Sequence, residues 1–379
     1  MVAELTIDTS LNGLVPVSKM GIRELETIRL ILRGGSIIDW RRLSYRSRDE
    51  VDAFLRQHYF NTDDPSDRAW VRRVLDEAVD YLRTAFDYRV ASPVADPVEI
   101  HDLFLYASGA KEPQKWRRIA CIVLKVMHVI HHIEGRELLY RTPISEADLF
   151  RLIDEKVLTL SEGMQQRGFP IVEFVGNVKL RSSIITKLMA KKETVAAQVF
   201  DKVRYRIVTK TSDDILPVLL HLSQALFPYN LVLPAQTENT LVRFRNVVEK
   251  TPELRALIGE LQSDLDLEDV ERLQKERRGE HNRFSGSSYK VLNFVVDMPV
   301  RIDGYLPPPD REVISSANKV VFGLVEFQMI DEATARANDE GENSHDRYKR
   351  RQRKMVLRRL SRGLVVPKGM LKKSKPRDN

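Results

Sequence analysis

The sequence predicts an α+β protein, with mixed α/β character, in which a helical N-terminal half precedes a mixed sheet flanked by helices. Between about residues 20 and 165, apolar residues recur at the spacing of an amphipathic helix. After about residue 168, runs of β-branched and aromatic residues appear, separated by helical stretches. A chain of 379 residues is also long enough for two domains. We therefore expect a helical domain over 1–165 and a sheet-containing domain over 166–360.

The helical pattern of the first half is clearest in four stretches, at 22–33, 67–86, 116–133 and 145–164. Segments rich in glycine, proline, serine and aspartate separate them, and several place Asp or Ser where a helix cap is needed. We expect loops at GGS (34–36), DDPSD (63–67), SPVADP (92–97) and GAKEP (109–113).

The second half contains four stretches typical of strands, FPIVEFV (169–175), VRYRIVT (203–209), YKVLNFVVDM (289–298) and VVFGLVEFQMI (320–330). Helical patterns at 182–192 and 213–227 lie between them. A charged helical stretch over 253–277 is expected to be an insertion between two strands.

Charge is unevenly distributed along the chain. From residue 345 to residue 379 there are 14 Lys and Arg against two Asp, a local charge of +12, so the rest of the chain carries −5. Such a basic end, which includes a tail over 361–379, favours contact with RNA or nucleotides, although a solvated tail is the alternative. No signal peptide or membrane-spanning stretch is evident, so we expect a cytoplasmic protein with no membrane contact. A single cysteine, Cys121, excludes an internal disulfide framework.

The segment VGNVKLRSSIITKLMAKK combines cations and a hydroxyl with a helix start. Lys179 precedes the helix, and Ser183 and Lys187 follow at steps of four residues along one face. The free N–H groups and the dipole of a helix N-terminus favour phosphate, so this stripe is a candidate polyphosphate site. The alternative is an ordinary solvated helix face.

Asp201 opens the next strand, which contains Arg204 and Arg206. The carboxylate could hold a metal ion and an arginine could hold phosphate. Strict alternation places Asp201 and Arg206 on opposite faces, so both serve one site only if Asp201 lies at the strand entrance.

The last strand pattern contains two polar residues, Glu326 and Gln328, which alternation places on the opposite face from Val325, Phe327 and Met329. A glutamate within an apolar strand is costly to bury unless it is paired or binds a metal. Glu326 is therefore a candidate functional residue, and an exposed edge strand is the alternative.

The order of these segments resembles the synthetase domain of the RelA/SpoT family. The resemblance covers about residues 170–352 and involves GNVKLRSSIITKL, DKVRYRIV, SSYKVLNFVV, VEFQM and SHDRYK, in that order. In the first motif, Lys179, Ser183 and Lys187 match, whereas Asn177 stands in place of an arginine. In the second, Asp201 and Arg206 match, and Arg204 replaces a glycine.

The later motifs match in part as well. Tyr289 matches the tyrosine that stacks on guanine in the family, and Asn293 replaces a histidine. Glu326 and Gln328 match, whereas Ile330 replaces an arginine. His345, Tyr348 and Lys349 match the residues that close the domain.

The resemblance implies a magnesium-dependent enzyme that transfers pyrophosphate from ATP to the 3′-hydroxyl of GDP or GTP, and so makes guanosine tetra- or pentaphosphate. It implies catalytic and metal-binding roles for Asp201 and Glu326. It also implies nucleotide-binding roles for eight residues: Lys179, Ser183, Lys187, Arg206, Tyr289, Asn293, Gln328 and His345. The departures leave two alternatives open: transfer to a tRNA 3′ end, or a domain that binds nucleotide or RNA without transferring.

The long enzymes of this family also carry a hydrolase domain, so histidines of the first half are relevant. The pair His101 and Asp102 lacks the surrounding pattern, and we expect no hydrolase activity. His128 and His132 share a helical face with Cys121, which could form part of a metal site, although buried core histidines are the more common reason for such a pattern.

Overall fold

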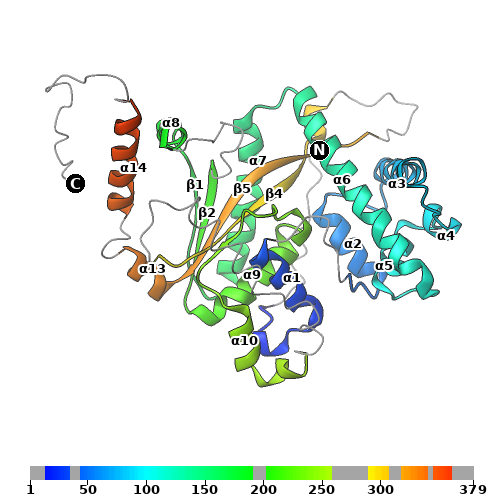
Figure 1. Ribbon diagram of the computed structural model, residues 1–379, viewed down its shortest axis with the longest axis horizontal. Helices are drawn as coiled ribbons and strands as arrows, with labels where there is room; N and C mark the ends of the chain where they lie inside the picture. Colours follow the sequence, from blue (N-terminus) through cyan, green and yellow to red (C-terminus); the bar gives the residue numbers. More distant parts are fainter. Residues whose placement is uncertain are drawn as a thin grey trace.

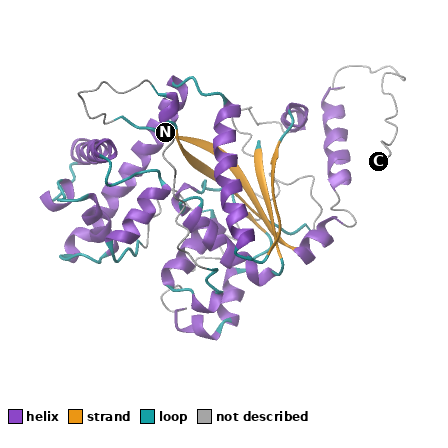
Figure 2. Cartoon of the chain, turned by 180° about the vertical axis from the view of Figure 1, so that it is seen from behind, coloured by secondary structure: helices purple, strands orange, loops and turns teal. Residues whose placement is uncertain are grey.

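The computed structural model describes residues 13–34, 43–190, 202–257, 289–306, 317–339 and 345–360. Within these ranges the chain is an α+β protein, with one mixed sheet of five strands and helices on both of its faces (Figure 1). Figure 2 shows the same arrangement from behind, with much of the helical N-terminal half lying to one side of the sheet.

The N-terminal half is helical, as the periodicity predicts. Its helices are α1 (Ile22–Arg33), α2 (Arg48–Gln57), α3 (Pro65–Phe86), α4 (Ser92–Ala95), α5 (Ile100–Ser108), α6 (Arg117–Arg141) and α7 (Glu146–Gln166). The start of α3 illustrates why they begin where they do, since the Asp64 carboxylate accepts hydrogen bonds from the backbone N–H groups of Ser66 and Asp67. The prediction of a loop throughout SPVADP was wrong, because Pro93 fits the first turn of the short helix α4.

The sheet contains β1 (Ile171–Val178), β2 (Val203–Thr209), β3 (Glu238–Asn239), β4 (Leu292–Arg301) and β5 (Val320–Asp331), in the order β1-β2-β5-β4-β3. Strand β5 is the central strand of this order. It runs parallel to β2 and antiparallel to β4, so the sheet is mixed. The four predicted strands are confirmed. Strand β3 was not predicted because two residues are too few to show a pattern.

The remaining helices follow the strands. They are α8 (Arg181–Ala190), α9 (Ile215–Ala225), α10 (Phe244–Lys250), α13 (Glu332–Asp339) and α14 (His345–Leu360). Of the expected helical insertion over 253–277, the structure describes only a 3₁₀ turn at Pro252–Leu257, and the rest lies outside the described residues.

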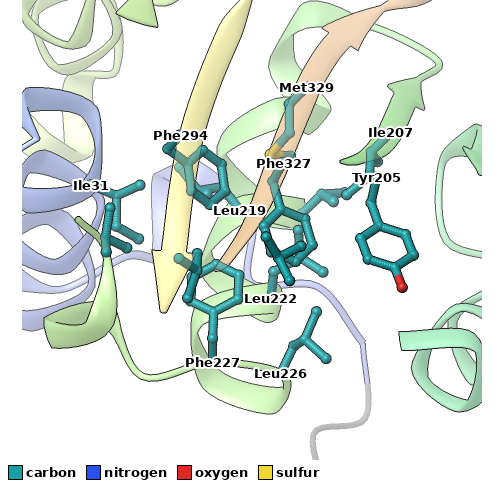
Figure 3. Close-up of a cluster of buried hydrophobic side chains, with 14 of the residues drawn as sticks. Ile31, Tyr205, Ile207, Leu219, Leu222, Leu226, Phe227, Phe294, Phe327 and Met329 are labelled. Carbon is teal, nitrogen blue, oxygen red and sulfur yellow. The ribbon is translucent and has the colours of Figure 1, made fainter. Parts of the chain in front are cut away.

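One face of the sheet is apolar and forms the main core. Phe327 of the central strand lies between Phe294 and Tyr205, and it contacts Phe227, which follows α9 (Figure 3). Leu219 and other apolar residues of α9 fill this layer, as do residues of α1 and α7. Burial of these side chains is the main source of stability for the sheet and fixes which face of β5 remains available for polar groups.

A second core lies among helices α2 to α6 and contains residues between Leu43 and Ile130. Helices α1 and α7, which belong to the same half of the sequence, instead share the core of the sheet. The domain boundary near residue 165 stays a prediction, but the hydrophobic cores divide the chain differently from that boundary.

The other face of the sheet is polar toward one end and covered by α6 toward the other. The ring of His132 stacks on Phe322 of β5 with centroids 4.6 Å apart, and Arg136 binds both carboxylate oxygens of Asp297 at 2.8 and 2.9 Å. Figures 1 and 2 show α8 and α14 on the opposite side of the sheet from α7 and α9. No helix within the described ranges has the length and apolar character to cross a bilayer.

Candidate functional site

Polar side chains from neighbouring strands form two rows on the polar face of the sheet. In the first row, Asn177 of β1 pairs with Arg204 of β2, which pairs with Glu326 of β5. In the second row, Arg206 of β2 pairs with Gln328 of β5. Gln328 in turn pairs with Asn293 of β4, and Asn293 pairs with Glu238 of β3. Side chains of paired residues project from the same face, so these rows are one surface.

Glu326 lies at the centre of this surface. It is on the middle strand and is only 9% exposed, which excludes the alternative of an exposed edge strand. Its Oε2 accepts a hydrogen bond of 2.7 Å from Nε of Arg204, and the two groups form an ion pair. The ion pair supplies the partner that a carboxylate needs when it is removed from water.

Arg206 is the second arginine of the same strand and the same face. Its Nε lies 3.7 Å from Oε1 of Glu173 on β1, which is too far for a hydrogen bond. This Nε is buried and has no hydrogen-bond partner among the described residues. Arg206 therefore presents a positive group with an unused donor beside Gln328.

Gln328 connects the sheet to the segment that carries Tyr289. Its Nε2 donates a hydrogen bond of 2.9 Å to the Tyr289 hydroxyl. Burial raises the pKa of that phenol, so Tyr289 remains neutral at physiological pH. Two further side chains hold the segment: Asn338 bonds to both backbone groups of Lys290, and Thr240 accepts from the N–H of Val291.

Asn293 lies beside Gln328 on the adjacent strand. Its side-chain oxygen is buried and accepts no hydrogen bond within the described part of the chain. A buried side-chain oxygen usually accepts a hydrogen bond, so the N–H of a ligand or a water is the expected donor to Asn293. The site thus contains an unused donor at Arg206 and an unused acceptor at Asn293, on either side of Gln328.

Ile330 follows on the same face and ends the polar surface. It is 2% exposed and packs with Val208, Val291 and Ala335 in a small apolar cluster that also contacts Tyr289. This packing explains why an isoleucine is stable at this position. Among the described residues of the two rows, the cationic side chains are Arg204 and Arg206, both on β2.

Three predicted nucleotide-binding residues follow the end of β1: Lys179 directly, and Ser183 and Lys187 on the next helix. The N–H of Lys179 donates to the carbonyl of Lys202 at 2.8 Å, which continues the pairing of β1 and β2 by one residue. Ser183 is exposed and Lys187 is half-buried, and both are on α8, which contacts α14. His345 is the first residue of α14. Asp201 lies outside the described residues.

The described residues do not make a magnesium site around Glu326. They provide a single carboxylate in its row, and that carboxylate is already paired with Arg204. Nowhere in the described part of the chain do three or more His, Cys, Asp or Glu side chains gather so that they could hold a metal ion.

The histidines of the N-terminal half make contacts within the fold. His101 is 2.8 Å from Asp52, and Asp102 pairs with Lys111. His128 and His131 are buried between the helical core and the sheet, and His128 meets Asn230 at 3.1 Å. The possible metal site at His128, His132 and Cys121 is not formed in the described structure.

Sequence reasoning missed several residues that shape the site. Asn338 and Thr240 position the Tyr289 segment, and Glu173 lies beside Arg206. No local motif distinguishes these residues, and their roles depend on strand register. The register also reveals that Arg204 stands next to Glu326, which spacing along the chain does not show.

No family model matches the chain, and no curated protein matches it. Among solved structures, the chain is similar to the small alarmone synthetase 1 from Bacillus subtilis, with 14% identity and a TM-score of 0.29 over 55% of this chain and 85% of that one. It is also similar to the same synthetase bound to its product pppGpp, with 14% identity and a TM-score of 0.26 over 66% and 96%.

A third similar structure is a GTP pyrophosphokinase family protein from Streptococcus pneumoniae, with 14% identity and a TM-score of 0.29 over 56% of this chain and 84% of that one. Two of these three structures are therefore of a small alarmone synthetase, and the third is of a GTP pyrophosphokinase family protein.

Proposed function

We propose that the polar face of the sheet binds ATP and a guanine nucleotide and transfers pyrophosphate from the first to the 3′-hydroxyl of the second. The observation that supports this most is the single surface formed by Arg204, Arg206, Glu326, Gln328 and Asn293, with an unused donor and an unused acceptor on it. Arginines suit a polyphosphate, and amide groups suit the edge of a base.

The transfer has a simple balance of bonds. The 3′-oxygen of the acceptor forms a bond to the β-phosphorus of ATP, and the bond from that phosphorus to the oxygen bridging it to the α-phosphorus breaks. AMP leaves, and the hydroxyl proton passes to a base. This chemistry depends mainly on positioning and on neutralising phosphate charge. Glu326, a carboxylate at the centre of the surface, is the proposed base.

The other residues bind and orient the two nucleotides. Arg206 and Lys179 are on the side of β1 and β2 and would bind the donor phosphates, together with Ser183 and Lys187 of α8. Tyr289 lies on the side of β4 and would stack on the acceptor base. The donor and acceptor would then meet over Glu326, which is between them in the strand order.

Magnesium remains a proposed cofactor through its binding to ATP, with Asp201 and Glu326 as the proposed protein ligands. The described residues alone do not form this site.

The ion pair between Arg204 and Glu326 favours a second candidate, a domain that binds nucleotide without transferring pyrophosphate. In that case the carboxylate is a structural partner of Arg204. Nucleotides would still bind to Arg206, Gln328 and Tyr289. Transfer, and not binding, separates the two candidates.

The test is to incubate the purified full chain with ATP labelled in its β-phosphate and with GDP, GTP or tRNA. Label on a guanine nucleotide supports the proposal, whereas label on tRNA alone would move the acceptor to RNA. Bound ATP with no transferred label would support the second candidate.

A substitution at Glu326 makes the test specific. Glu326→Gln keeps the size of the side chain and should lower transfer by about 100-fold or more, since a general base contributes on that order. Glu155→Gln, in an exposed pair on α7, is the matched control and should transfer as the wild type does. Full activity of a folded Glu326→Gln protein would refute the role of Glu326.

A further inference from the structure

We propose that Glu238 of β3 selects guanine as the base of the acceptor nucleotide. Its carboxylate accepts hydrogen bonds from the N1–H of guanine and from one N–H of the 2-amino group, and the side-chain oxygen of Asn293 accepts the other N–H of that group. This inference rests on the function proposed above and identifies the residues that distinguish its acceptor from other nucleotides.

Glu238 lies at the β3 end of the second polar row. The order along that row, from β2 to β3, is Arg206, Gln328, Asn293 and Glu238. One end of the row therefore carries a positive charge and the other a negative charge, with two neutral amides between them. Phosphates are attracted by Arg206 and repelled by Glu238, so the part of a nucleotide that lies at the β3 end is its base.

Contacts next to β3 place Glu238 near Tyr289, the residue proposed to stack on that base. Thr240 follows β3; its N–H donates to the carbonyl of Val291 at 2.9 Å, and its hydroxyl accepts from the N–H of Val291 at 2.8 Å. The segment that carries Tyr289 is thus joined to β3. Burial is the main cause of the raised pKa of Tyr289, and the negative charge of Glu238 adds to it. A base stacked on Tyr289 therefore has Glu238 at its edge.

Asn293 supplies the second acceptor. It is the cross-strand neighbour of Glu238, so both side chains project from the polar face and their β-carbons are about 5 Å apart. The side-chain oxygen of Asn293 is buried and accepts no hydrogen bond within the described part of the chain. Buried polar groups are normally paired, and the 2-amino group of guanine supplies the donor that this oxygen needs.

Guanine differs from the other purines at the edge that would face these acceptors. It carries one N–H at N1 and two on the neighbouring 2-amino group, whereas adenine has a lone pair at N1 and hypoxanthine has no amino group. An ionised carboxylate only accepts hydrogen bonds, so Glu238 matches guanine and repels the lone pair of adenine. Hydrogen bonds to a charged acceptor are about twice as strong as neutral ones, which makes the carboxylate the main source of selectivity.

The distance from Glu238 to the proposed base of the reaction suits a nucleoside. Strand β3 is two strands from β5, about 10 Å across the sheet. This distance is comparable with the length of a nucleoside from the edge of its base to its 3′-oxygen. A guanine held at Glu238 therefore directs its 3′-hydroxyl toward Glu326, and the ion pair between Glu326 and Arg204 stays intact.

The experiment measures, by calorimetric titration in EDTA, the affinity of the purified full chain for GDP, for IDP, which lacks the 2-amino group, and for ADP. The wild type should bind GDP about 10- to 100-fold more tightly than IDP, as expected for hydrogen bonds to a charged acceptor, and should bind ADP more weakly than IDP. Glu238→Gln should bind GDP about tenfold more weakly with a smaller change for IDP, so that the ratio of the two affinities falls. Glu249→Gln, in an exposed pair on α10, is the matched control and should keep the wild-type ratio.

The ratio separates recognition of the base from a structural role, because a loss of packing would weaken GDP and IDP equally. Glu238 is half-buried on an edge strand, so its replacement by glutamine should leave the fold intact. At the neighbouring position, Asn293→Ala should lower the ratio about three- to tenfold, as expected for loss of one neutral hydrogen bond. Asn293→Asp keeps an oxygen and should keep the preference for GDP.

Equal binding of GDP and IDP by the wild type would overturn this proposal, as would a wild-type ratio in Glu238→Gln. If the ratio falls as expected but the wild type transfers no label, the proposed transfer fails and the recognition of guanine stands. If label reaches a guanine nucleotide but the ratio is the same in Glu238→Gln, the transfer stands and Glu238 does not select the base.

Discussion

Gly135 of α6 lies directly against the ring of Phe322 of β5. A β-carbon on Gly135 would be 2.3 Å from Cε2 of that ring and 3.2 Å from the carbonyl oxygen of Val320. The absence of a side chain at Gly135 therefore lets the helix approach the polar face of the sheet. His132 and Arg136, on the same helix, reach Phe322 and Asp297 only because of this approach.

Gly135→Ala should destabilise the protein. The added methyl group must push α6 away from the sheet, and overpacking of this kind costs about 1–3 kcal/mol in free energy of unfolding. Urea denaturation would measure the change. Gly163→Ala is the matched control, because Gly163 is also within a helix and its β-carbon would meet nothing within 4 Å. Equal stability of the two variants would contradict the close contact at Phe322.

Stability should fall as the pH is lowered from 7 toward 4. Burial lowers the pKa of His58 and of His132 to about 4, and it holds the pKa values of His128 and His131 well below the usual range. In the unfolded chain these histidines take up protons near pH 6.5. Their contribution to stability is therefore complete above pH 6.5 and is lost as the pH falls toward 4, by at most about 1.4 kcal/mol per pH unit for each.

Asp297 opposes this trend. Burial raises its pKa from 3.8 to about 6, so its contribution to the stability of the fold is complete below pH 3.8 and is lost as the pH rises through 6. The four histidines outweigh one aspartate, and the denaturation midpoint measured between pH 7.5 and 4.5 should decrease in acid. A midpoint that does not decrease would show that these histidines become protonated without unfolding.

Tyr289 should contribute to binding of the guanine nucleotide through its ring. Tyr289→Ala should weaken binding of GDP or GTP about 10- to 100-fold, the usual effect of losing one stacked aromatic ring. Tyr289→Phe should retain most of the affinity, because it loses only the hydroxyl that accepts from Gln328. Calorimetric titration would measure both variants, with the exposed Tyr140→Ala as control. Normal binding by Tyr289→Ala would remove this residue from the acceptor site.

Helix α14 should determine whether the chain binds RNA. Among the side chains of this helix that the structure describes, five Lys and Arg are exposed: Lys349, Arg350, Arg353, Lys354 and Arg358. If they contact RNA phosphates, changing Arg353 and Lys354 to glutamine should reduce the slope of log affinity against log salt by about 1.5. The same change at the exposed Arg83 and Arg118 is the control. Equal slopes for the two double variants would exclude α14 as the RNA-binding surface.

Most of the fold is predictable from local pattern. Alternation along 320–330 predicts both a strand and the face on which Glu326 lies, and the structure confirms both. The pairing of strands is not predictable in this way, because residues 204 and 326 are 122 positions apart. Sequence spacing therefore indicates Glu326 as a candidate but does not reveal that Arg204 is its partner.

The same reason limits prediction of the rest of the site. Asn293 could be identified as a departure from a motif, but only its burial shows that its oxygen has no partner in the described structure. Ile330 could be identified as a substitution for arginine, but only its packing against Val208 and Ala335 explains why it is stable there. In both cases the deciding contacts come from residues distant in the chain.

The central position of β5 has a consequence for the speed of any change at Glu326. Hydrogen bonds to β2 on one side and to β4 on the other hold its backbone, so the ion pair between Glu326 and Arg204 opens by rotation of side chains. Rotations of partly exposed side chains take picoseconds to nanoseconds, far less time than rearrangement of a sheet. Any change in this ion pair on nucleotide binding would therefore keep pace with each encounter, and the strands should superpose in crystals grown with and without nucleotide.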